Sequence, residues 1–113
     1  MTEHDFQQYR CLVQETKYLQ QELLHLQNQD PTTHPAADPR YTQLLHKRRE
    51  NCKQQLMALE NSIAQVDDSR IRLILSLRYQ KGYSWQKVAF AMGESDESYP
   101  RRLCKQFMNR YKQ

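Results

Sequence analysis

The sequence predicts an all-α protein, in which an N-terminal antiparallel, coiled-coil-like helical hairpin precedes three short helices. Two of the 113 residues are glycine and four are proline, too few for the many turns of a β-sandwich or a β-barrel. Glutamine, leucine, lysine and arginine are abundant, as is typical of long helices. Only 38% of the residues are apolar, so a large core is not available. We assign residues 1–66 to the hairpin and residues 67–113 to the three short helices.

The hairpin is predicted from two seams, in which mostly apolar side chains alternate in steps of three and four, as in a heptad pattern. The first seam lies within residues 5–28 and the second begins after about Asp38. Between them the stretch NQDPTTHPAADPR contains three prolines, so we expect an irregular loop over residues 29–39. The first seam consists of Tyr9, Leu12, Thr16, Leu19, Leu23 and Leu26, and the second of Leu45, Arg49, Cys52, Leu56, Leu59, Ile63 and Val66.

Apolar residues outside these seams predict a second contact surface on the hairpin. Val13 and Leu24 lie off the first seam, and Leu44 and Met57 lie off the second. Two paired helices cannot cover both sets, so we expect contact with the C-terminal helices or self-association into a homodimer or higher oligomer. The polar seam members Thr16 and Arg49 either fix the register of the hairpin or lie at its edge.

Two of the three short helices are bounded by the only glycines of the chain. Asp67 and Asp68 can cap the first of these helices at its N-terminus, and Gly82 can end it in the left-handed conformation that glycine adopts without strain. Ser84 can cap the next helix, and Gly93 can end it. The apolar side chains expected in the core are Ile71, Ile74, Leu75 and Tyr79, then Trp85, Val88, Ala89 and Met92.

The last helix begins at either Ser95 or Ser98. Pro100 would cost roughly 3 kcal/mol in a helix interior but is tolerated in a first turn, so the start at Ser98 is preferred. Side chains recurring every four residues predict the buried stripe of this helix as Tyr99, Leu103, Phe107 and Tyr111.

A short helix, a glycine turn and a basic helix make up a helix-turn-helix, and the order of residues in this part resembles region 4 of bacterial sigma factors. The residues that carry the resemblance are Leu77, Arg78, Tyr79, Gly82, Ser84, Val88, Ala89, Met92, Gly93, Ser95, Tyr99 and Leu103. A helical hairpin followed by such a module is similar to phage-encoded transcriptional regulators of the ArpU and RinA type. The resemblance implies a regulator of late phage genes in the cytoplasm of a bacterial host, with double-stranded DNA as partner and RNA polymerase as a further candidate.

The distribution of charge agrees with a polyanionic partner for the last three helices. Residues 67–113 hold ten Lys and Arg against five Asp and Glu, whereas residues 1–66 hold seven against eight. The second helix of a helix-turn-helix lies in the major groove, where arginine can pair with guanine. Candidate base-reading residues are Glu97, Ser98, Arg101 and Arg102, and candidate phosphate contacts are Ser84, Gln86, Lys87, Lys105 and Arg110.

Acidic residues at the start of the last helix weaken this expectation. Glu94, Asp96 and Glu97 would repel phosphate, although a carboxylate can accept from cytosine N4 and can stabilise a helix N-terminus. We therefore expect weak, steeply salt-dependent binding by a single module. Two other functions remain open, a small terminase subunit for phage DNA packaging and an adaptor that docks on RNA polymerase.

No pattern in the sequence predicts a catalytic, cofactor or metal site. The four histidines lack zinc-like spacing, and neither a phosphate-binding loop nor a nucleophile elbow is present. Cys11, Cys52 and Cys104 have no CxxC spacing, and we expect each to be a buried thiol in a reducing cytoplasm. No apolar run is long enough to span a membrane, and Trp85 is expected to anchor the small core. The sequence thus predicts a binding protein and not an enzyme.

Overall fold

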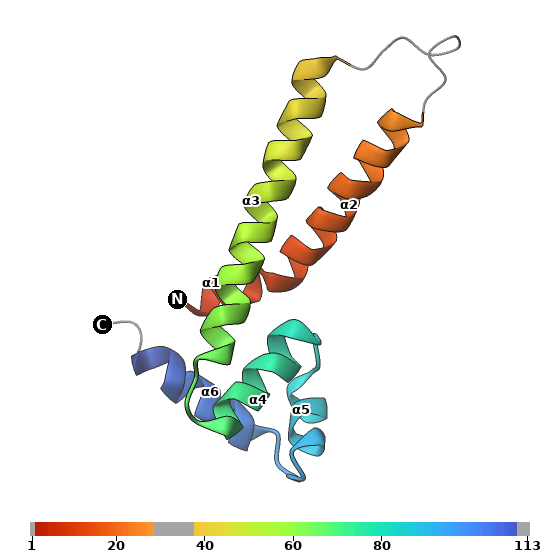
Figure 1. Ribbon diagram of the computed structural model, residues 1–113. Helices are drawn as coiled ribbons and strands as arrows, with labels where there is room; N and C mark the ends of the chain where they lie inside the picture. Colours follow the sequence, from red (N-terminus) through yellow and green to blue (C-terminus); the bar gives the residue numbers. More distant parts are fainter. Residues whose placement is uncertain (1, 29–37, 111–113) are drawn as a thin grey trace. The chain divides into compact units, whose positions relative to one another are not determined.

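The structure, a computed structural model, is all-α, with a long antiparallel helix pair followed by shorter packed helices (Figure 1). It describes residues 2–28 and 38–110. The expected loop at 29–39 therefore lies almost entirely outside the described residues, as does Tyr111. The elements are α1 (Glu3–Gln7), α2 (Tyr9–Gln27), α3 (Pro39–Ala64), α4 (Ser69–Leu75), the π-helix η1 (Ser76–Gln80), α5 (Trp85–Ala91) and α6 (Ser98–Arg110).

The chain packs as two compact units, which we call the hairpin unit and the C-terminal unit. The hairpin unit consists of residues 11–57, and the C-terminal unit combines residues 1–10 with residues 58–113. The sequence-based division into 1–66 and 67–113 as separate domains stays a prediction.

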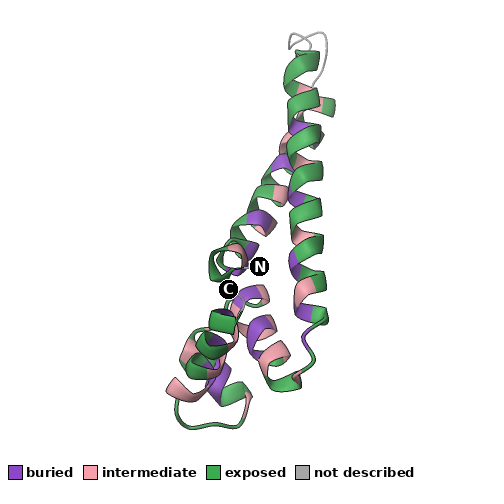
Figure 2. Ribbon diagram, turned by 90° about the vertical axis from the view of Figure 1, so that its left-hand side faces the viewer, coloured by how far each residue is buried: buried purple, intermediate pink, exposed green. Residues whose placement is uncertain are grey.

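In the hairpin unit, most apolar members of the seam predicted from the heptad pattern are buried, whereas Leu26 and Leu56 are half-buried. Leu12, Leu19 and Leu23 of α2 and Leu45 and Cys52 of α3 are each at most 8% exposed. Figure 2 shows how buried positions recur along both helices between exposed ones. Burial of apolar surface at this repeat stabilises the pair, because each buried side chain is removed from water.

The two polar seam residues, Thr16 and Arg49, differ in their hydrogen bonding. The Thr16 hydroxyl donates a hydrogen bond to the Leu12 carbonyl oxygen at 2.7 Å, within its own helix. The Nε of Arg49 is buried and has no hydrogen-bond partner among the residues that the structure describes. Arg49 thus buries a polar nitrogen at a cost to the hairpin.

Apolar side chains outside the seam are exposed to different degrees. Val13 is half-buried, whereas Leu24, Leu44 and Met57 are exposed. The structure therefore leaves uncovered most of the side chains that the sequence placed off the seam.

Residues from the start of the chain pack within the C-terminal unit. The Phe6 ring lies 5.6 Å from the Tyr79 ring between centroids, and the Tyr9 hydroxyl donates to Glu60 at 2.8 Å. Arg10 donates from Nη1 to the Gln80 carbonyl oxygen at 3.3 Å. The sequence pattern predicted one helix over residues 5–28, but the chain breaks at Gln8 into α1 and α2.

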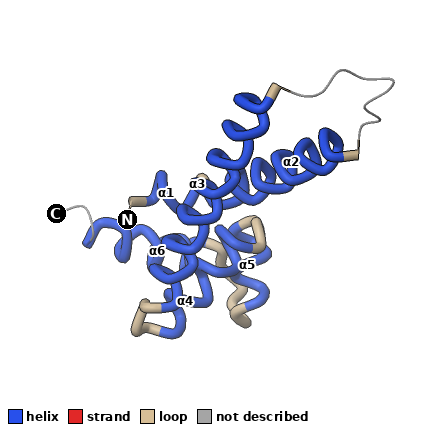
Figure 3. Tube along the Cα trace, turned by 45° about the horizontal axis from the view of Figure 1, so that its top comes forward, coloured by secondary structure: helices blue, strands red, loops and turns tan. Residues whose placement is uncertain are grey.

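Most predicted helix boundaries of the C-terminal unit are confirmed, but the first short helix, predicted to be continuous up to Gly82, is divided into α4, which ends at Leu75, and the π-helix η1, which ends at Gln80. The Asp68 side chain caps α4 by accepting from the Arg70 backbone N–H at 2.9 Å. Gly82 and Gly93 have positive φ angles of 74° and 78°, as the turns on either side of α5 require. Helix α6 begins at Ser98, which places Pro100 in its first turn. The helices are joined here by short loops (Figure 3).

The buried side of α6 differs from the sequence-based prediction by one position. Pro100, Cys104 and Met108 are buried, whereas Tyr99, Leu103 and Phe107 are only half-buried. Helix α6 packs on α4 and α5, and small side chains such as Pro100 and Cys104 allow the backbones to approach closely. The larger side chains then flank this line of contact, where the Tyr99 hydroxyl accepts from Arg70 Nη1 at 3.2 Å.

Candidate nucleic-acid interface

The cations of α6 lie outside the line of buried residues through which the helix packs on α4 and α5. Arg101, Arg102, Lys105 and Arg110 are all exposed. Helix periodicity explains this arrangement, because the buried positions 100, 104 and 108 recur every four residues and leave the positions between them for solvent. By the same periodicity Arg101, Arg102 and Lys105 are neighbours on the helix surface, whereas Arg110 lies half a turn from Arg101 and lines a groove with Asp67, Asp68 and Ile71.

Two acidic residues organise the start of α6. The Asp96 carboxylate accepts from the Ser98 backbone N–H at 2.9 Å and from the Ser98 hydroxyl at 2.6 Å. These hydrogen bonds from Ser98 lower the pKa of Asp96. Ser98 is half-buried, and its hydroxyl serves the helix start. A hydrogen bond donated by Ser98 to a base would require its hydroxyl to leave Asp96.

Glu97 forms an ion pair with Arg101 one helical turn further along. Arg101 Nη2 lies 3.3 Å from Glu97 Oε1, and the two side chains are 53% and 51% exposed. Exposed pairs at this helical spacing contribute only about 0.3–0.5 kcal/mol. The pair therefore neutralises Arg101 while leaving its guanidinium group easy to displace.

Trp85 lies within cation–π range of guanidinium groups from two elements. The Cζ of Arg78, from η1, is 4.8 Å from the centroid of the Trp85 ring, and the Cζ of Arg101, from α6, is 6.0 Å away. Arg78 also donates from Nη1 to the Tyr83 carbonyl oxygen at 2.9 Å. Trp85 is half-buried, so the prediction that it anchors the core is wrong: the buried side chains around it in the sequence include Ile74, Leu75, Tyr79, Val88, Ala89, Cys104 and Met108.

The phosphate-contact candidates of α5 are exposed. Ser84, Gln86 and Lys87 lie at the beginning of that helix, where the Ser84 hydroxyl accepts from the Lys87 backbone N–H at 3.2 Å. The Lys87 ammonium lies 4.5 Å from the centroid of the Tyr83 ring.

Sequence reasoning missed Arg78 and Tyr83 as members of this site. The signal available was their spacing, because Tyr83 and Trp85 lie between Arg78 and Lys87 around the turn at Gly82. Aromatic and basic residues interleaved in this way can meet when the chain turns sharply.

The cysteines differ in their environment. Cys52 and Cys104 are buried as expected, but Cys11 is exposed, because it lies off the Tyr9–Leu12 seam of α2. Burial raises the pKa of the Cys104 thiol, and the Tyr79 hydroxyl lies 3.9 Å from its Sγ. Burial also raises the pKa of Tyr79, so both groups stay neutral near pH 7.

The described residues contain neither a metal site nor a membrane-spanning helix. Among residues 2–28 and 38–110, no group of three or more histidine, cysteine or acidic side chains is placed to hold a metal ion. No helix in that part of the chain combines the length and apolar character needed to cross a membrane. Comparison of the chain with models of protein families, with curated proteins and with solved structures finds no match.

Proposed function

We propose that this chain is a sequence-specific regulator of transcription that binds double-stranded DNA through α5 and α6. The observation that carries the proposal is the exposed cationic side of α6, formed by Arg101, Arg102 and Lys105 on a helix that packs through Pro100, Cys104 and Met108. A helix presented in this way can enter a major groove, which admits an α-helix.

The contacts within the C-terminal unit support separate roles for its cations. Arg101 and Arg102, in the first half of α6, are the candidates for guanine, because the N-terminal residues of a recognition helix contact base edges. Lys105 and Arg110, further along α6, and Lys87 on α5 are candidates for phosphates. Phosphate contacts position the protein and base contacts specify the sequence.

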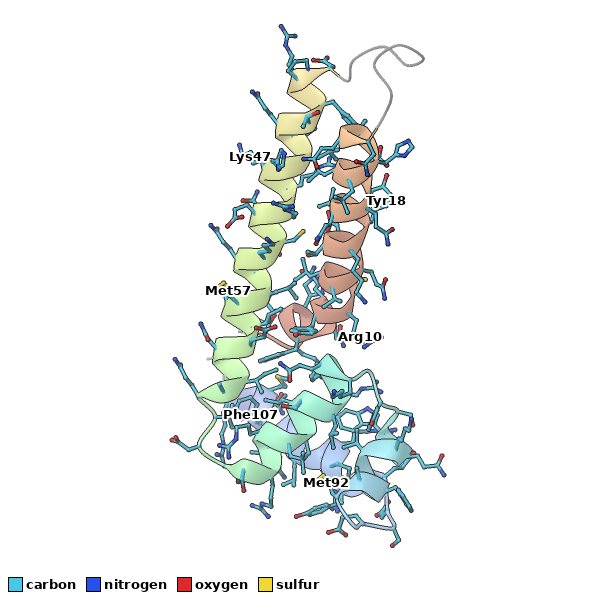
Figure 4. The ribbon with its side chains drawn as sticks, turned by 45° about the vertical axis from the view of Figure 1, so that its right-hand side comes forward. Arg10, Tyr18, Lys47, Met57, Met92 and Phe107 are labelled. Atoms are coloured by element: carbon cyan, nitrogen blue, oxygen red, sulfur yellow. The ribbon has the colours of Figure 1, made fainter. Side chains whose placement is uncertain are left out.

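The hairpin unit is proposed to join two or more copies of the chain. Leu24 and Leu44 are 50% and 47% exposed, and Met57 is 61% exposed. Figure 4 shows the side chains of Tyr18 and Met57 projecting from different sides of the hairpin. Dimerisation would let two recognition helices bind adjacent half-sites, so that their binding energies combine.

The resemblance to sigma region 4 and to phage regulators of the ArpU and RinA type supports a role in phage or prophage transcription, in the cytoplasm of a bacterial host. A second candidate, docking on RNA polymerase as an adaptor, is favoured by Phe90 of α5, whose side chain is 83% exposed. A large aromatic residue at this exposure is more typical of a protein contact than of a phosphate contact.

A salt titration of duplex binding tests the proposal. We expect a labelled random duplex to bind at low salt and to lose affinity steeply between about 50 and 200 mM salt. The double variant Lys105→Gln, Arg110→Gln should weaken binding and make the slope of log affinity against log salt shallower by up to about two, since each lost phosphate contact removes about one.

The matched control changes two exposed cations of α3, Arg48→Gln and Lys53→Gln, and should leave both affinity and slope close to those of the parent chain. Absence of duplex binding at low salt would reject the DNA-binding function and favour the adaptor. Equal losses in the two double variants would show that net charge, and not α6, carries the binding.

A further inference from the structure

The contacts around Trp85 form a chain that ends on the recognition helix. The Nη1 of Arg78 is fixed on the Tyr83 carbonyl oxygen at 2.9 Å, and its guanidinium group lies 4.8 Å from the Trp85 ring centroid. The guanidinium group of Arg101 lies 6.0 Å from the same ring. All of these residues belong to the C-terminal unit.

We propose that Arg78 and Trp85 are positioning residues that hold the Arg101 guanidinium group for duplex recognition, and that Glu97 restrains it until a better acceptor replaces the carboxylate. The inference rests on the proposed function and deepens it, because it assigns the specificity of the site to residues outside the exposed side of α6.

Trp85 is suited to hold an arginine without neutralising it. The face of an indole ring attracts a guanidinium group within about 6 Å. The ring carries no net charge and does not use the N–H groups of the arginine, which stay available for hydrogen bonds to a base. Arg78 is half-buried and is itself held by Tyr83, so it restricts the orientation of the ring. An arginine whose plane is already restricted loses less freedom when it forms two hydrogen bonds to guanine.

Glu97 supplies the opposite effect. Its carboxylate lies 3.3 Å from Arg101 Nη2 and competes with any acceptor on the duplex. A single phosphate oxygen replaces one acceptor with another, whereas the O6 and N7 atoms of guanine offer two acceptors to the same guanidinium group. The ion pair therefore lowers binding to random sequence more than binding to a site with guanine in register.

The free protein provides the first measurement, because Trp85 is the only tryptophan of the chain. Its emission spectrum and its quenching by acrylamide report directly on the proposed cluster. Arg78→Gln and Arg101→Gln should each change both properties. Arg102→Gln is the matched control, since Arg102 lines a separate groove of about 210 Å³ with Tyr99, Leu103 and Gln106, and it should leave both unchanged.

Duplex binding provides the second measurement, with two probes: a random duplex pool and a duplex recovered from that pool by repeated selection with the parent protein. Trp85→Leu should weaken binding to the selected duplex by about two- to fivefold, the range of an exposed cation–π contact, and weaken binding to the random pool less. Trp85→Phe keeps an aromatic face and should restore most of the loss. The salt slope should not change, because neither variant alters a charge.

Glu97→Gln should act in the other direction. It should raise affinity for the random pool by about twofold, as expected for removal of an exposed ion pair, and should lower the ratio of selected to random affinity. In the Trp85→Leu background, Arg78→Gln should have no further effect on that ratio, since Arg78 is proposed to act through the ring.

The outcomes separate the inference from the function that it rests on. Duplex binding with an affinity ratio that neither Trp85→Leu nor Glu97→Gln changes would overturn the inference alone. Trp85 emission that is unaffected by Arg101→Gln in the folded protein would also overturn it. If the parent protein binds no duplex at low salt, the proposed function fails, and this inference fails with it. Circular dichroism of each variant establishes that it is folded before either measurement.

Discussion

Helices α2 and α3 span 19 and 26 residues, whereas the other five helices span between 5 and 13. Helices shorter than about 12–15 residues are marginal on their own in water. The hairpin can therefore depend on a repeated seam along its length. The short helices need both a common core and well-defined ends.

The ends of the short helices are accordingly built from specific contacts. Asp68 caps α4 and Ser84 caps α5, and Asp96 supports the start of α6. Each of the two turns that flank α5 contains a glycine with positive φ. We infer that the C-terminal unit is sensitive to changes at helix ends and turns, whereas the hairpin unit is sensitive mainly along its seam.

The largest expected effect comes from the core of the C-terminal unit. Leu75 is fully buried, so Leu75→Ala should lower the free energy of unfolding by about 2–5 kcal/mol, through lost burial and the cavity left behind. Urea unfolding followed by Trp85 fluorescence measures this loss. The control Leu73→Ala, two positions earlier and 44% exposed, should change stability by less than about 0.5 kcal/mol.

A leucine-to-alanine substitution in the seam allows the stability of the hairpin unit to be compared with that of the C-terminal unit. Leu19 is 1% exposed, and Leu19→Ala should destabilise the hairpin unit by an amount in the same range of about 2–5 kcal/mol. Circular dichroism should report the loss of helix, while Trp85 fluorescence reports the C-terminal unit. A single shared transition for both variants and both probes would show that the units unfold together, and would contradict the distinction drawn here.

Substitution of the two glycines tests the turns on either side of α5. Gly82→Ala and Gly93→Ala each force an alanine into the left-handed region, at about 1–2 kcal/mol. At Gly82 an added Cβ would also lie 2.8 Å from the Arg10 side chain, whereas at Gly93 it would meet nothing within 4 Å. Gly82→Ala should therefore destabilise the C-terminal unit slightly more than Gly93→Ala does, because the end of the flexible Arg10 side chain has to shift, and urea midpoints measure the difference.

A second background isolates the contribution of Arg10. In the Arg10→Ala protein the two glycine substitutions should cost nearly the same, because only the backbone penalty remains. A persistent difference between them would mean that the Arg10 side chain moves aside freely and that another feature of the turn at Gly82 is responsible.

Sequence periodicity predicted the hairpin seam well because the pattern is repeated. Over long helices a register error would expose several leucines at once, so buried positions such as Leu19, Leu23 and Leu45 follow from the spacing alone. Glycine and capping residues likewise predicted most ends of the short helices, but not the change from α4 to the π-helix η1 after Leu75. Pro100 predicted the start of α6 at Ser98, because the restriction that proline places on a helix acts only on neighbouring residues and can be read from the sequence.

The details that sequence reasoning missed depend on tertiary packing. The stripe of α6 was misplaced by one position because half-buried Leu103 and Phe107 are more apolar than buried Pro100 and Cys104. The contact between Phe6 and Tyr79 joins residues that are far apart in the sequence. The position of Arg78 over Trp85 depends on the turn at Gly82, which places η1 beside α5. None of these contacts has a periodic signal.

A smaller effect is expected at the polar position Arg49 in the seam of the hairpin unit. The Nε of Arg49 is buried without a partner among the described residues, so Arg49→Met should stabilise the hairpin unit by about 1 kcal/mol through removal of an unsatisfied donor. The exposed neighbour Arg48 provides the matched variant, Arg48→Met, which should have little effect. Thermal unfolding followed by circular dichroism measures the stability of both variants.

Destabilisation by Arg49→Met would instead indicate that the guanidinium group fixes the register of the hairpin. Analytical ultracentrifugation would then show whether the oligomeric state changes in this variant.

The smallest expected effect is a pH dependence confined to the helix ends of the C-terminal unit. Hydrogen bonds lower the pKa of three carboxyl groups there: Asp5 through the Thr2 backbone N–H, Asp68 through Arg70, and Asp96 through Ser98. A carboxyl group whose pKa is lowered by folding stabilises the folded state above its ordinary pKa, near 3.8, and this stabilisation is lost as the pH falls through the lower folded value. At pH values below about 4, the urea midpoint of the C-terminal unit should therefore decrease. The combined variant Asp68→Asn, Asp96→Asn should show a flatter dependence of this midpoint on pH.

The control is Glu50→Gln, on α3 and away from these helix starts, which should retain the pH dependence of the parent. An equal flattening in both variants would place the acid sensitivity in general charge balance, and would contradict the role assigned to the capped helix ends.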